Sequence, residues 1–253
     1  MRVIAIVQAR MGSSRLPGKV LAELGGAPML TQVVARVRAA ATVSAVVIAT
    51  TERPEDDALV EVAEAAGAQV FRGSTDDVLA RYVGAARAHH AQVVIRLTAD
   101  CPLLDPAVID AVVEGLLTTP GCDYASNTHH RTYPRGLDVE AMYAPTLERL
   151  HKLAVSPAHR EHVTAYLLDH PDGFVIQQLV ADRDDSHLRW TVDTELDLAL
   201  VRRLYAEARV HPSMPYRALV EWVAAHPGLA TANAEVPQRS WRHAAVEELR
   251  RHG

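Results

Sequence analysis

The chain begins with Met1-Arg-Val-Ile-Ala-Ile-Val7 and continues directly into Gln8-Ala-Arg-Met-Gly-Ser-Ser-Arg-Leu-Pro-Gly-Lys19. The first run is short, apolar and rich in β-branched residues, which predicts a buried strand. The second run contains three cations, Arg10, Arg15 and Lys19, and no acidic residue. A strand that leads into such a loop predicts a binding site for a polyanion.

Small residues in this loop support the same interpretation. Gly12, Ser13 and Ser14 would let backbone N–H groups approach a ligand. The loop has neither the spacing of a P-loop nor that of a dinucleotide-binding turn. The alternative is a basic surface loop with a turn at Pro17-Gly18.

Strand and helix patterns alternate beyond this loop. Such alternation predicts an α/β fold with a mostly parallel central sheet, whose ligands bind beyond the carboxyl ends of the strands. The expected strands are residues 3–7, 45–50, 69–72, 93–97 and 188–192. The expected helices are residues 28–41, 54–66, 75–88, 106–117, 157–169, 194–208, 215–225 and a charged one at 244–251.

Composition restricts the class of protein. The chain has 253 residues and a net charge of −5, which suits one domain over residues 1–253 and disfavours a nucleic-acid binder. No apolar run is long enough for a membrane span or a signal peptide. Two cysteines, Cys101 and Cys122, without CxxC spacing fit a reducing compartment. We therefore expect a cytoplasmic protein.

Several segments together resemble the sugar-acid cytidylyltransferases. The opening signature Val7-Gln-Ala-Arg-Met-Gly-Ser-Ser-Arg-Leu-Pro-Gly-Lys-Val-Leu21 is most similar to the branch named for spore-coat polysaccharide biosynthesis protein F. Related branches make CMP-Kdo and CMP-sialic acid. The other matching segments are residues 71–79, 96–105, 134–140, 159–164 and 189–195.

The resemblance implies a Rossmann-like, GT-A-type nucleotidyltransferase fold with helices on both faces of the sheet. It implies CTP and a small sugar-like or acidic acceptor as substrates, a homodimer, and a region at 127–174 for acceptor binding or dimer contact. Arg10 and Arg15 would hold the triphosphate, and Lys19 would stabilise charge at the α-phosphate. The implied nucleotide-binding residues are Ala9, Arg10, Gly12, Ser13, Arg15, Lys19, Arg72, Gly73 and Ser74.

Two aspartates are the candidate ligands of a Mg²⁺ ion. Asp100 and Asp193 each follow a predicted strand, and the resemblance implies that they converge on the metal. As alternatives, Asp193 would cap the next helix, a role that Thr194 with Asp197 could share, and Asp100 would be a turn residue.

A capping alternative also applies to the turn after the third strand. Ser74 or Thr75 is expected to cap the helix at 75–88, whatever the turn does for the nucleotide.

The acceptor is expected to meet the polar stretch at 127–140. Its candidate residues are Asn127, Arg131, Arg135 and Asp138, and the two arginines suit a carboxylate or a phosphate. A solvated loop is the alternative. His159-Arg-Glu-His162 is not a zinc signature and suits a helix surface or a dimer contact, and Cys101 suits a small buried filler.

Three other functions stay open at this stage. One is a nucleotidyltransferase that uses another NTP and a sugar 1-phosphate. Another is a glycosyltransferase, for which Asp182-Arg-Asp184 has the DxD spacing although a solvated turn also explains it. The last is a non-catalytic metabolite-binding protein. The cation-rich first loop favours a free triphosphate as the ligand.

Overall fold

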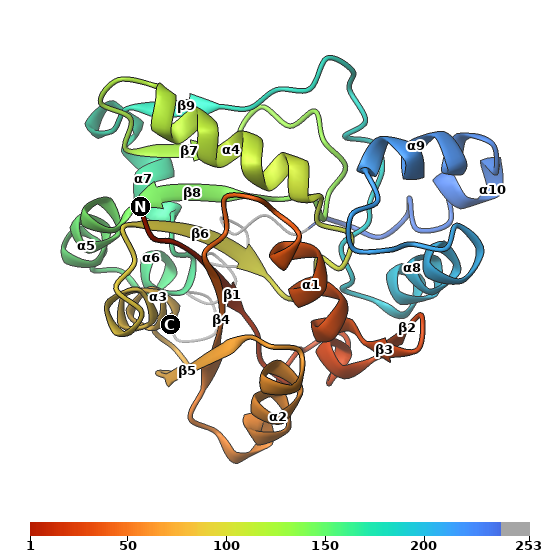
Figure 1. The fold of residues 1–253 in the computed structure, drawn as a ribbon, viewed down its shortest axis with the longest axis horizontal. Helices are drawn as coiled ribbons and strands as arrows, with labels where there is room; N and C mark the ends of the chain where they lie inside the picture. The colour runs from red at the N-terminus through yellow and green to blue at the C-terminus, as the bar shows by residue number, and fades with distance from the viewer. Residues whose placement is uncertain (239–253) are drawn as a thin grey trace, which may run out of the picture.

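The computed structural model describes residues 1–238 of the chain, and within them seven strands form one sheet in the order β5-β4-β1-β6-β8-β7-β9 (Figure 1). β8 is antiparallel to its neighbours β6 and β7, and the other pairs are parallel. The expected mostly parallel sheet is confirmed. The strands are β1 (Val3–Gln8), β4 (Ala45–Thr51), β5 (Gln69–Gly73), β6 (Val93–Thr98), β7 (Tyr124–Ser126), β8 (Glu140–Tyr143) and β9 (Ile176–Gln178).

Helices cover both faces of the sheet, as expected for a Rossmann-like fold. The helices of the described residues are α1 (Met29–Arg38), α2 (Asp57–Ala65), α3 (Val78–Ala88), α4 (Pro106–Thr118), α5 (Ala144–Leu153), α6 (Pro157–Glu161), α7 (Ala165–Asp169), α8 (Glu195–Glu207), α9 (Tyr216–Ala224) and α10 (Pro227–Ala230). Along β1, Ala5 and Val7 pack with α1 and α4, whereas Ile4 and Ile6 pack with α3 and α5. Because both faces are buried, the strand has the continuous apolar sequence of a parallel sheet.

The strand expected at residues 188–192 is wrong. This segment makes only an isolated bridge, between Arg135 and Arg189, and then crosses the end of β6, where Val192 N donates to Asp100 O at 2.8 Å. The same segment also packs tightly against Gly136. A Cβ atom there would lie 2.6 Å from the backbone nitrogen of Thr191, and the φ of Gly136 is 101°. Close backbone contact therefore replaces strand pairing in this segment.

The helix expected at residues 157–169 is two short helices, α6 and α7. They are separated at Val163 and Thr164, which are both buried. The hydroxyl of Thr164 donates to Glu140 Oε1 at 2.7 Å. This break turns the chain so that a buried carboxylate receives a hydrogen bond.

Two helix caps decide between the alternatives left open above. α3 begins at Val78 and is capped by Asp77, whose Oδ1 accepts from Ala80 N at 2.8 Å, so a cap by Ser74 or Thr75 is wrong. α8 begins after Thr194, which forms a capping box with Asp197. Asp193 is therefore not the cap of α8.

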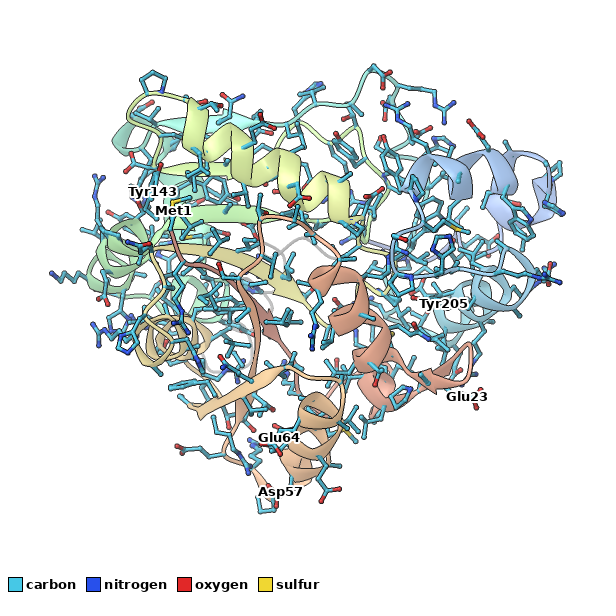
Figure 2. The ribbon with its side chains drawn as sticks, viewed as in Figure 1. Met1, Glu23, Asp57, Glu64, Tyr143 and Tyr205 are labelled. Atoms are coloured by element: carbon cyan, nitrogen blue, oxygen red, sulfur yellow. The ribbon has the colours of Figure 1, made fainter. Side chains whose placement is uncertain are left out.

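A small hairpin and the last helices form one side of the molecule. β2 (Glu23–Leu24) and β3 (Ala27–Pro28) make the hairpin, and Arg202 Nε of α8 donates to Glu23 O at 3.2 Å. Figure 2 shows Tyr205 of α8 and Glu23 at this side, and Tyr205 donates to Pro102 O at 2.7 Å. α8 is thereby attached to the loop that follows β6, beside which the site lies.

Some expectations fall beyond what this fold can test. Over residues 1–238, every helix is too short or too polar to cross a lipid bilayer. The charged helix expected at 244–251 lies outside the described residues. The homodimer and the cytoplasmic location stay predictions.

Candidate active site

A pocket of about 340 Å³ opens at the carboxyl ends of β1 and β6. We call it the first pocket. The cation-rich loop after β1 contributes most of its charged lining, and α3 and α6 contribute further side chains. It is lined by Gln8, Ala9, Arg10, Ser13, Ser14, Arg15, Lys19, Val20, Val78, Arg81, Thr98, Ala99, Asp100, Glu161, His162 and Asp193.

Lys19 brings the two candidate metal ligands together. Its Nζ donates to Asp100 Oδ2 at 2.9 Å, to Asp193 Oδ1 at 3.0 Å and to the Val192 carbonyl at 2.7 Å. Gly18, with a φ of 70°, starts the short 3₁₀ helix η1 (Lys19–Leu21) that turns this side chain inward. Asp100 and Asp193 therefore converge, as predicted, although 81 and 174 positions separate them from Lys19.

Strong electrostatic coupling holds this cluster. Asp193 also accepts from Arg15 at 2.9 Å and from Arg189 at 2.8 Å. Burial would raise the pKa of Asp193, but Lys19, Arg15 and Arg189 outweigh it and hold that pKa below its ordinary value. Burial would likewise lower the pKa of Lys19, but Asp100 and Asp193 raise it. The lysine and Asp193 therefore remain charged at neutral pH.

The pair of aspartates fits a divalent cation. Carboxylate oxygens are the hard ligands that Mg²⁺ prefers, and two of them already contact a single cationic atom, Lys19 Nζ. Within the described residues no group of three or more His, Cys, Asp or Glu side chains could hold a metal. A cation held by Asp100 and Asp193 would therefore take its remaining ligands from a substrate or from water.

The other predicted residues of the first loop divide into two groups. Ala9, Arg10, Ser13 and Arg15 line the first pocket. Arg10 is exposed and, in the described part of the chain, forms no salt bridge, so its charge is available to a ligand. Gly12 does not line the pocket, and a Cβ atom on it would meet Glu55 at 3.5 Å.

The predicted turn at residues 72–74 does not line the first pocket. Arg72 donates to the carbonyls of Thr51 and Arg53, each at 2.9 Å, and pairs with Asp57. Its guanidinium is thus occupied by the protein. Ser74 accepts at its backbone carbonyl from Arg81 Nη1 at 3.1 Å.

Arg81 lines the first pocket and is absent from the sequence prediction. It lies among the buried residues of α3, between Leu79 and Tyr82. A signal was available, because an arginine on the apolar face of a predicted helix needs a partner or a ligand. Gly73 makes room for its stem, since a Cβ atom there would lie 3.2 Å from Arg81 Cγ.

A larger pocket, of about 770 Å³, adjoins the first. We call it the second pocket. The two share Thr98, Asp100, His162 and Asp193, so they meet at the two aspartates. The sequence favours a helix surface or a dimer contact for His162, whereas in the structure it lines both pockets. The other residues of the second pocket include Arg96, Cys101, Thr128, Arg131, Arg135, Gly136, Asp138, Glu140 and Thr164.

In the second pocket, one arginine has no carboxylate partner among the described residues. Arg131 pairs with Asp138 at 2.5 and 2.8 Å, and Arg96 pairs with Glu140. Arg135 forms no salt bridge within residues 1–238. Burial lowers the pKa of Arg135, and the neighbouring Arg131 lowers it further. An anion in this pocket would relieve that repulsion.

Asn127 has a structural role. It is 1% exposed, its Nδ2 donates to Leu137 O at 2.7 Å, and its Oδ1 accepts from Val139 N at 2.9 Å. It ties the loop together and lines neither pocket, unlike Arg131, Arg135 and Asp138. The solvated-loop alternative is wrong for the part that includes Leu137, which is fully buried.

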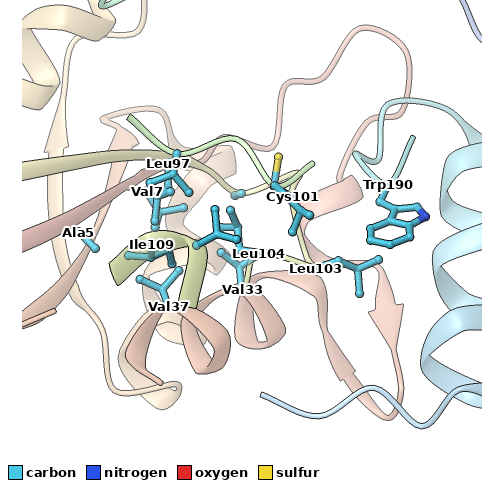
Figure 3. Packing of buried hydrophobic residues seen from close by; sticks show 14 of the residues in the cluster. Ala5, Val7, Val33, Val37, Leu97, Cys101, Leu103, Leu104, Ile109 and Trp190 are labelled. Atoms are coloured by element: carbon cyan, nitrogen blue, oxygen red, sulfur yellow. The ribbon is translucent and has the colours of Figure 1, made fainter. Parts of the chain in front are cut away.

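Three further motifs make no metal or nucleophile site. His159 pairs with Asp169 at 3.0 Å. Cys101 is buried among leucines such as Leu97 and Leu104 (Figure 3), and burial raises the pKa of its thiol well above the ordinary value, so it is a filler as expected. The DxD aspartates Asp182 and Asp184 are exposed and line neither pocket. They thus show no sign of a glycosyltransferase metal site.

Comparison with known proteins agrees with this geometry. A protein-family model described as "Cytidylyltransferase" matches residues 4–210. Spore coat polysaccharide biosynthesis protein SpsF of Bacillus subtilis is 35% identical over 236 residues, which are 90% of this chain and 97% of that protein. A solved structure of a cytidylyltransferase from Leptospira borgpetersenii superposes with a TM-score of 0.88 at 32% identity, covering 95% of this chain and 100% of that one. A 3-deoxy-manno-octulosonate cytidylyltransferase of Trichlorobacter lovleyi is 36% identical over 123 residues, 48% of this chain and 47% of that protein.

Proposed function

Since this chain belongs to the cytidylyltransferase family, on the branch that includes SpsF, it is a nucleotidyltransferase, and we propose that it transfers CMP from CTP to a small acidic sugar. A hydroxyl oxygen of the acceptor attacks the α-phosphorus of CTP, the bond from that phosphorus to the bridging oxygen breaks, and pyrophosphate leaves. The proton of the hydroxyl passes to solvent. The name of SpsF suggests a polysaccharide as the destination of the sugar.

The observation that carries this proposal is the meeting of two pockets at Lys19, Asp100 and Asp193. A transfer between two substrates needs their reacting atoms held together in a fixed geometry. CTP would occupy the first pocket, with its α-phosphate beside Lys19. The acceptor would occupy the second pocket, with its hydroxyl toward the same point.

The residues of the first pocket supply positioning and charge. Arg10 and Arg15 hold the β- and γ-phosphates by charge-assisted hydrogen bonds. Lys19 stabilises the negative charge that grows on the α-phosphate. Asp100 and Asp193 would hold Mg²⁺, which when bound neutralises phosphate charge and orients the triphosphate.

The second pocket suits an acceptor that carries a carboxylate and several hydroxyls. Arg135 has no carboxylate partner in the described residues and would bind the acid group. Asp138 and Arg131 form a pair whose outer edge can bind sugar hydroxyls. The 3-deoxy-manno-octulosonate cytidylyltransferase among the relatives is named for a sugar acid, which is an acceptor of this class.

Pyrophosphate release tests the proposed function directly. The purified protein would be mixed with Mg²⁺ and each of CTP, UTP, ATP and GTP, over a panel of sugar acids, neutral sugars and sugar 1-phosphates. We expect release with CTP and a sugar acid. Release only with a sugar 1-phosphate, or with UTP in preference to CTP, would contradict the proposal and favour the other nucleotidyltransferase class.

Arg135→Met is expected to raise the KM for the acidic acceptor by about ten- to a hundredfold, because a charge-assisted contact contributes about 1.5–3 kcal/mol. The KM for CTP should stay unchanged, since Arg135 lies outside the first pocket. Steady-state kinetics with each substrate varied in turn measures both constants. Arg183→Met, on an exposed loop outside both pockets, is the control. An unchanged acceptor KM would remove Arg135 from the acceptor site.

A further inference from the structure

The carboxylate of Asp193 accepts hydrogen bonds at both of its oxygens. Oδ1 accepts from Lys19 at 3.0 Å and from Arg15 at 2.9 Å, and both of these cations line the first pocket. Oδ2 accepts from Arg189 Nη2 at 2.8 Å. Arg189 is 7% exposed and lines neither pocket. It therefore acts on Asp193 without facing either pocket itself.

A second carboxylate, that of Asp197, fixes the guanidinium of Arg189. Arg189 Nε donates to Asp197 Oδ1 at 2.9 Å, and Nη2 donates to Asp197 Oδ2 at 3.3 Å. A two-bond contact of this kind sets the orientation of the guanidinium as well as its position. Asp197 is fully buried, and its Oδ2 also accepts from the backbone nitrogen of Asp193 at 3.0 Å. Asp197 thus holds the backbone of Asp193 directly and its side chain through Arg189.

The last part of the described chain adds two more contacts to this pair. Asn233 is 2% exposed, and its Nδ2 donates to Arg189 O at 2.9 Å and to Asp197 Oδ1 at 2.7 Å. Gln238 accepts from Arg189 Nη1 and lines the second pocket. The cytidylyltransferase family model matches residues 4–210, so Asn233 and Gln238 both lie beyond the matched part. A segment outside that part therefore contributes to the network.

Arg36, another buried arginine, shows what a role in the fold alone looks like. Its guanidinium donates to three backbone carbonyls and to no carboxylate that lines a pocket. Arg189 differs, because it joins a buried carboxylate to Asp193, at which the two pockets meet. Groups that hydrogen-bond a metal ligand fix its orientation, and their loss weakens metal binding or activity by about ten- to a hundredfold.

We propose that Arg189 and Asn233 are positioning residues: Arg189 holds the carboxylate of Asp193 in the orientation that binds the metal, and Asn233 holds Arg189. This inference rests on the proposed role of Asp193 as a metal ligand. Without the donor at Oδ2, the carboxylate could rotate about its Cβ–Cγ bond and take several orientations. The segment after residue 210 thereby takes part in forming the site, although the candidate reacting groups all precede it.

The test measures Mn²⁺ binding by electron paramagnetic resonance, with CTP present and the acceptor omitted, against a blank of CTP alone. Mn²⁺ takes the same oxygen ligands as Mg²⁺. We expect the Kd for Mn²⁺ to rise about ten- to a hundredfold in Arg189→Lys, which keeps the charge but loses the two-bond contact. In Asn233→Ala we expect a rise of about tenfold. Glu235→Gln, at an exposed position of the same segment, should keep the wild-type Kd.

Transfer activity over a Mg²⁺ titration separates positioning from a general loss of structure. In Arg189→Lys and Asn233→Ala, most of the lost rate should return at high Mg²⁺, because mass action fills a weakened site. An unchanged Kd for Mn²⁺ in Arg189→Lys, or a loss of rate that Mg²⁺ does not reverse, would overturn the inference. An unchanged Kd in Asn233→Ala alone would overturn the role of Asn233.

Asp193→Asn, measured in the same way, distinguishes a failure of this inference from a failure of the proposed site. If Asp193→Asn keeps the wild-type Kd for Mn²⁺, Asp193 is not a metal ligand, and the proposed metal site fails together with the inference. If Asp193→Asn weakens Mn²⁺ binding while Arg189→Lys leaves it unchanged, only the inference fails. Because no acceptor is present, neither result depends on which sugar the protein uses.

Discussion

Lys19→Met is expected to lower kcat for CMP transfer by about a hundred- to a thousandfold, and to raise the KM for CTP by less than about tenfold. The amine lies between Asp100 and Asp193, where the two pockets meet. With CTP bound as proposed, it would face the charge that grows on the α-phosphate during reaction. An interaction that strengthens in the transition state appears in kcat. Arg10 and Arg15 remain to bind the triphosphate.

Steady-state kinetics with CTP varied at saturating acceptor measures this effect. Lys152→Met is the matched control, since Lys152 is the chain's other lysine and is exposed on α5, outside both pockets. A large rise in the KM for CTP with a normal kcat would contradict the role, and would make Lys19 a ground-state binding residue.

The same variant should also change how the protein responds to metal. Without the lysine, Asp100 and Asp193 face each other with fewer hydrogen bonds, which should destabilise the protein by about 1–3 kcal/mol. A divalent cation can replace the missing charge. Thermal unfolding with and without Mg²⁺, in the absence of nucleotide, should therefore show a larger rise in Tm for Lys19→Met than for the wild type. Equal rises would mean that the metal does not bind between these carboxylates.

Asp100→Asn and Asp193→Asn are each expected to lower kcat/KM by about a hundredfold or more, and the double variant should be little worse than the poorer single one. Both carboxylates contact Lys19 Nζ and both would hold the same cation, so either loss already dismantles the site. Their effects should therefore be strongly non-additive.

The two single variants should differ in one respect. Asp193 also accepts from Arg15 and Arg189, whereas Asp100 Oδ1 accepts from the Thr98 hydroxyl at 2.6 Å. Losing the charge of Asp193 should therefore loosen Arg15 and raise the KM for CTP more than losing that of Asp100.

Steady-state rates measured over a Mg²⁺ titration test this prediction. The four proteins compared are the wild type, the two single variants and the double variant. The control is the double change Asp182→Asn and Asp184→Asn, because these exposed aspartates lie outside both pockets. Near-normal activity and metal dependence in Asp193→Asn would leave Asp193 as an anchor for arginines only. Additive losses would mean that the two aspartates act independently.

The sequence alone predicts the parallel half of the fold well. β1, β4, β5 and β6 and the helices between them follow from short apolar runs and helical periodicity, because these strands are buried on both faces and each is read from its own residues. The short strands β7, β8 and β9 cannot be predicted in this way. They have only three or four residues each, and their pairing joins segments far apart in the chain.

The residues of the site likewise fall into those that the sequence predicts and those that depend on the tertiary structure. Arg10, Arg15 and Lys19 were predictable because one loop carries all three, and the Thr194–Asp197 capping box was visible as a local pattern. Two features were not predictable, namely that Arg135 has no carboxylate partner within residues 1–238 and that Asn127 has a structural role, since neighbours brought in by folding determine them.

What the sequence determined by itself is therefore the set of candidate reacting groups: three cations on a loop after a strand, and two aspartates that follow buried segments. Only the tertiary structure decided that Asp193 is a partner of Lys19 and not a helix cap, and that Arg81 faces the first pocket. The physical reason is that Coulomb attraction and desolvation depend on distances through space. Those distances arise only when the crossing of residues 188–192 over the end of β6 brings Asp193 to Lys19.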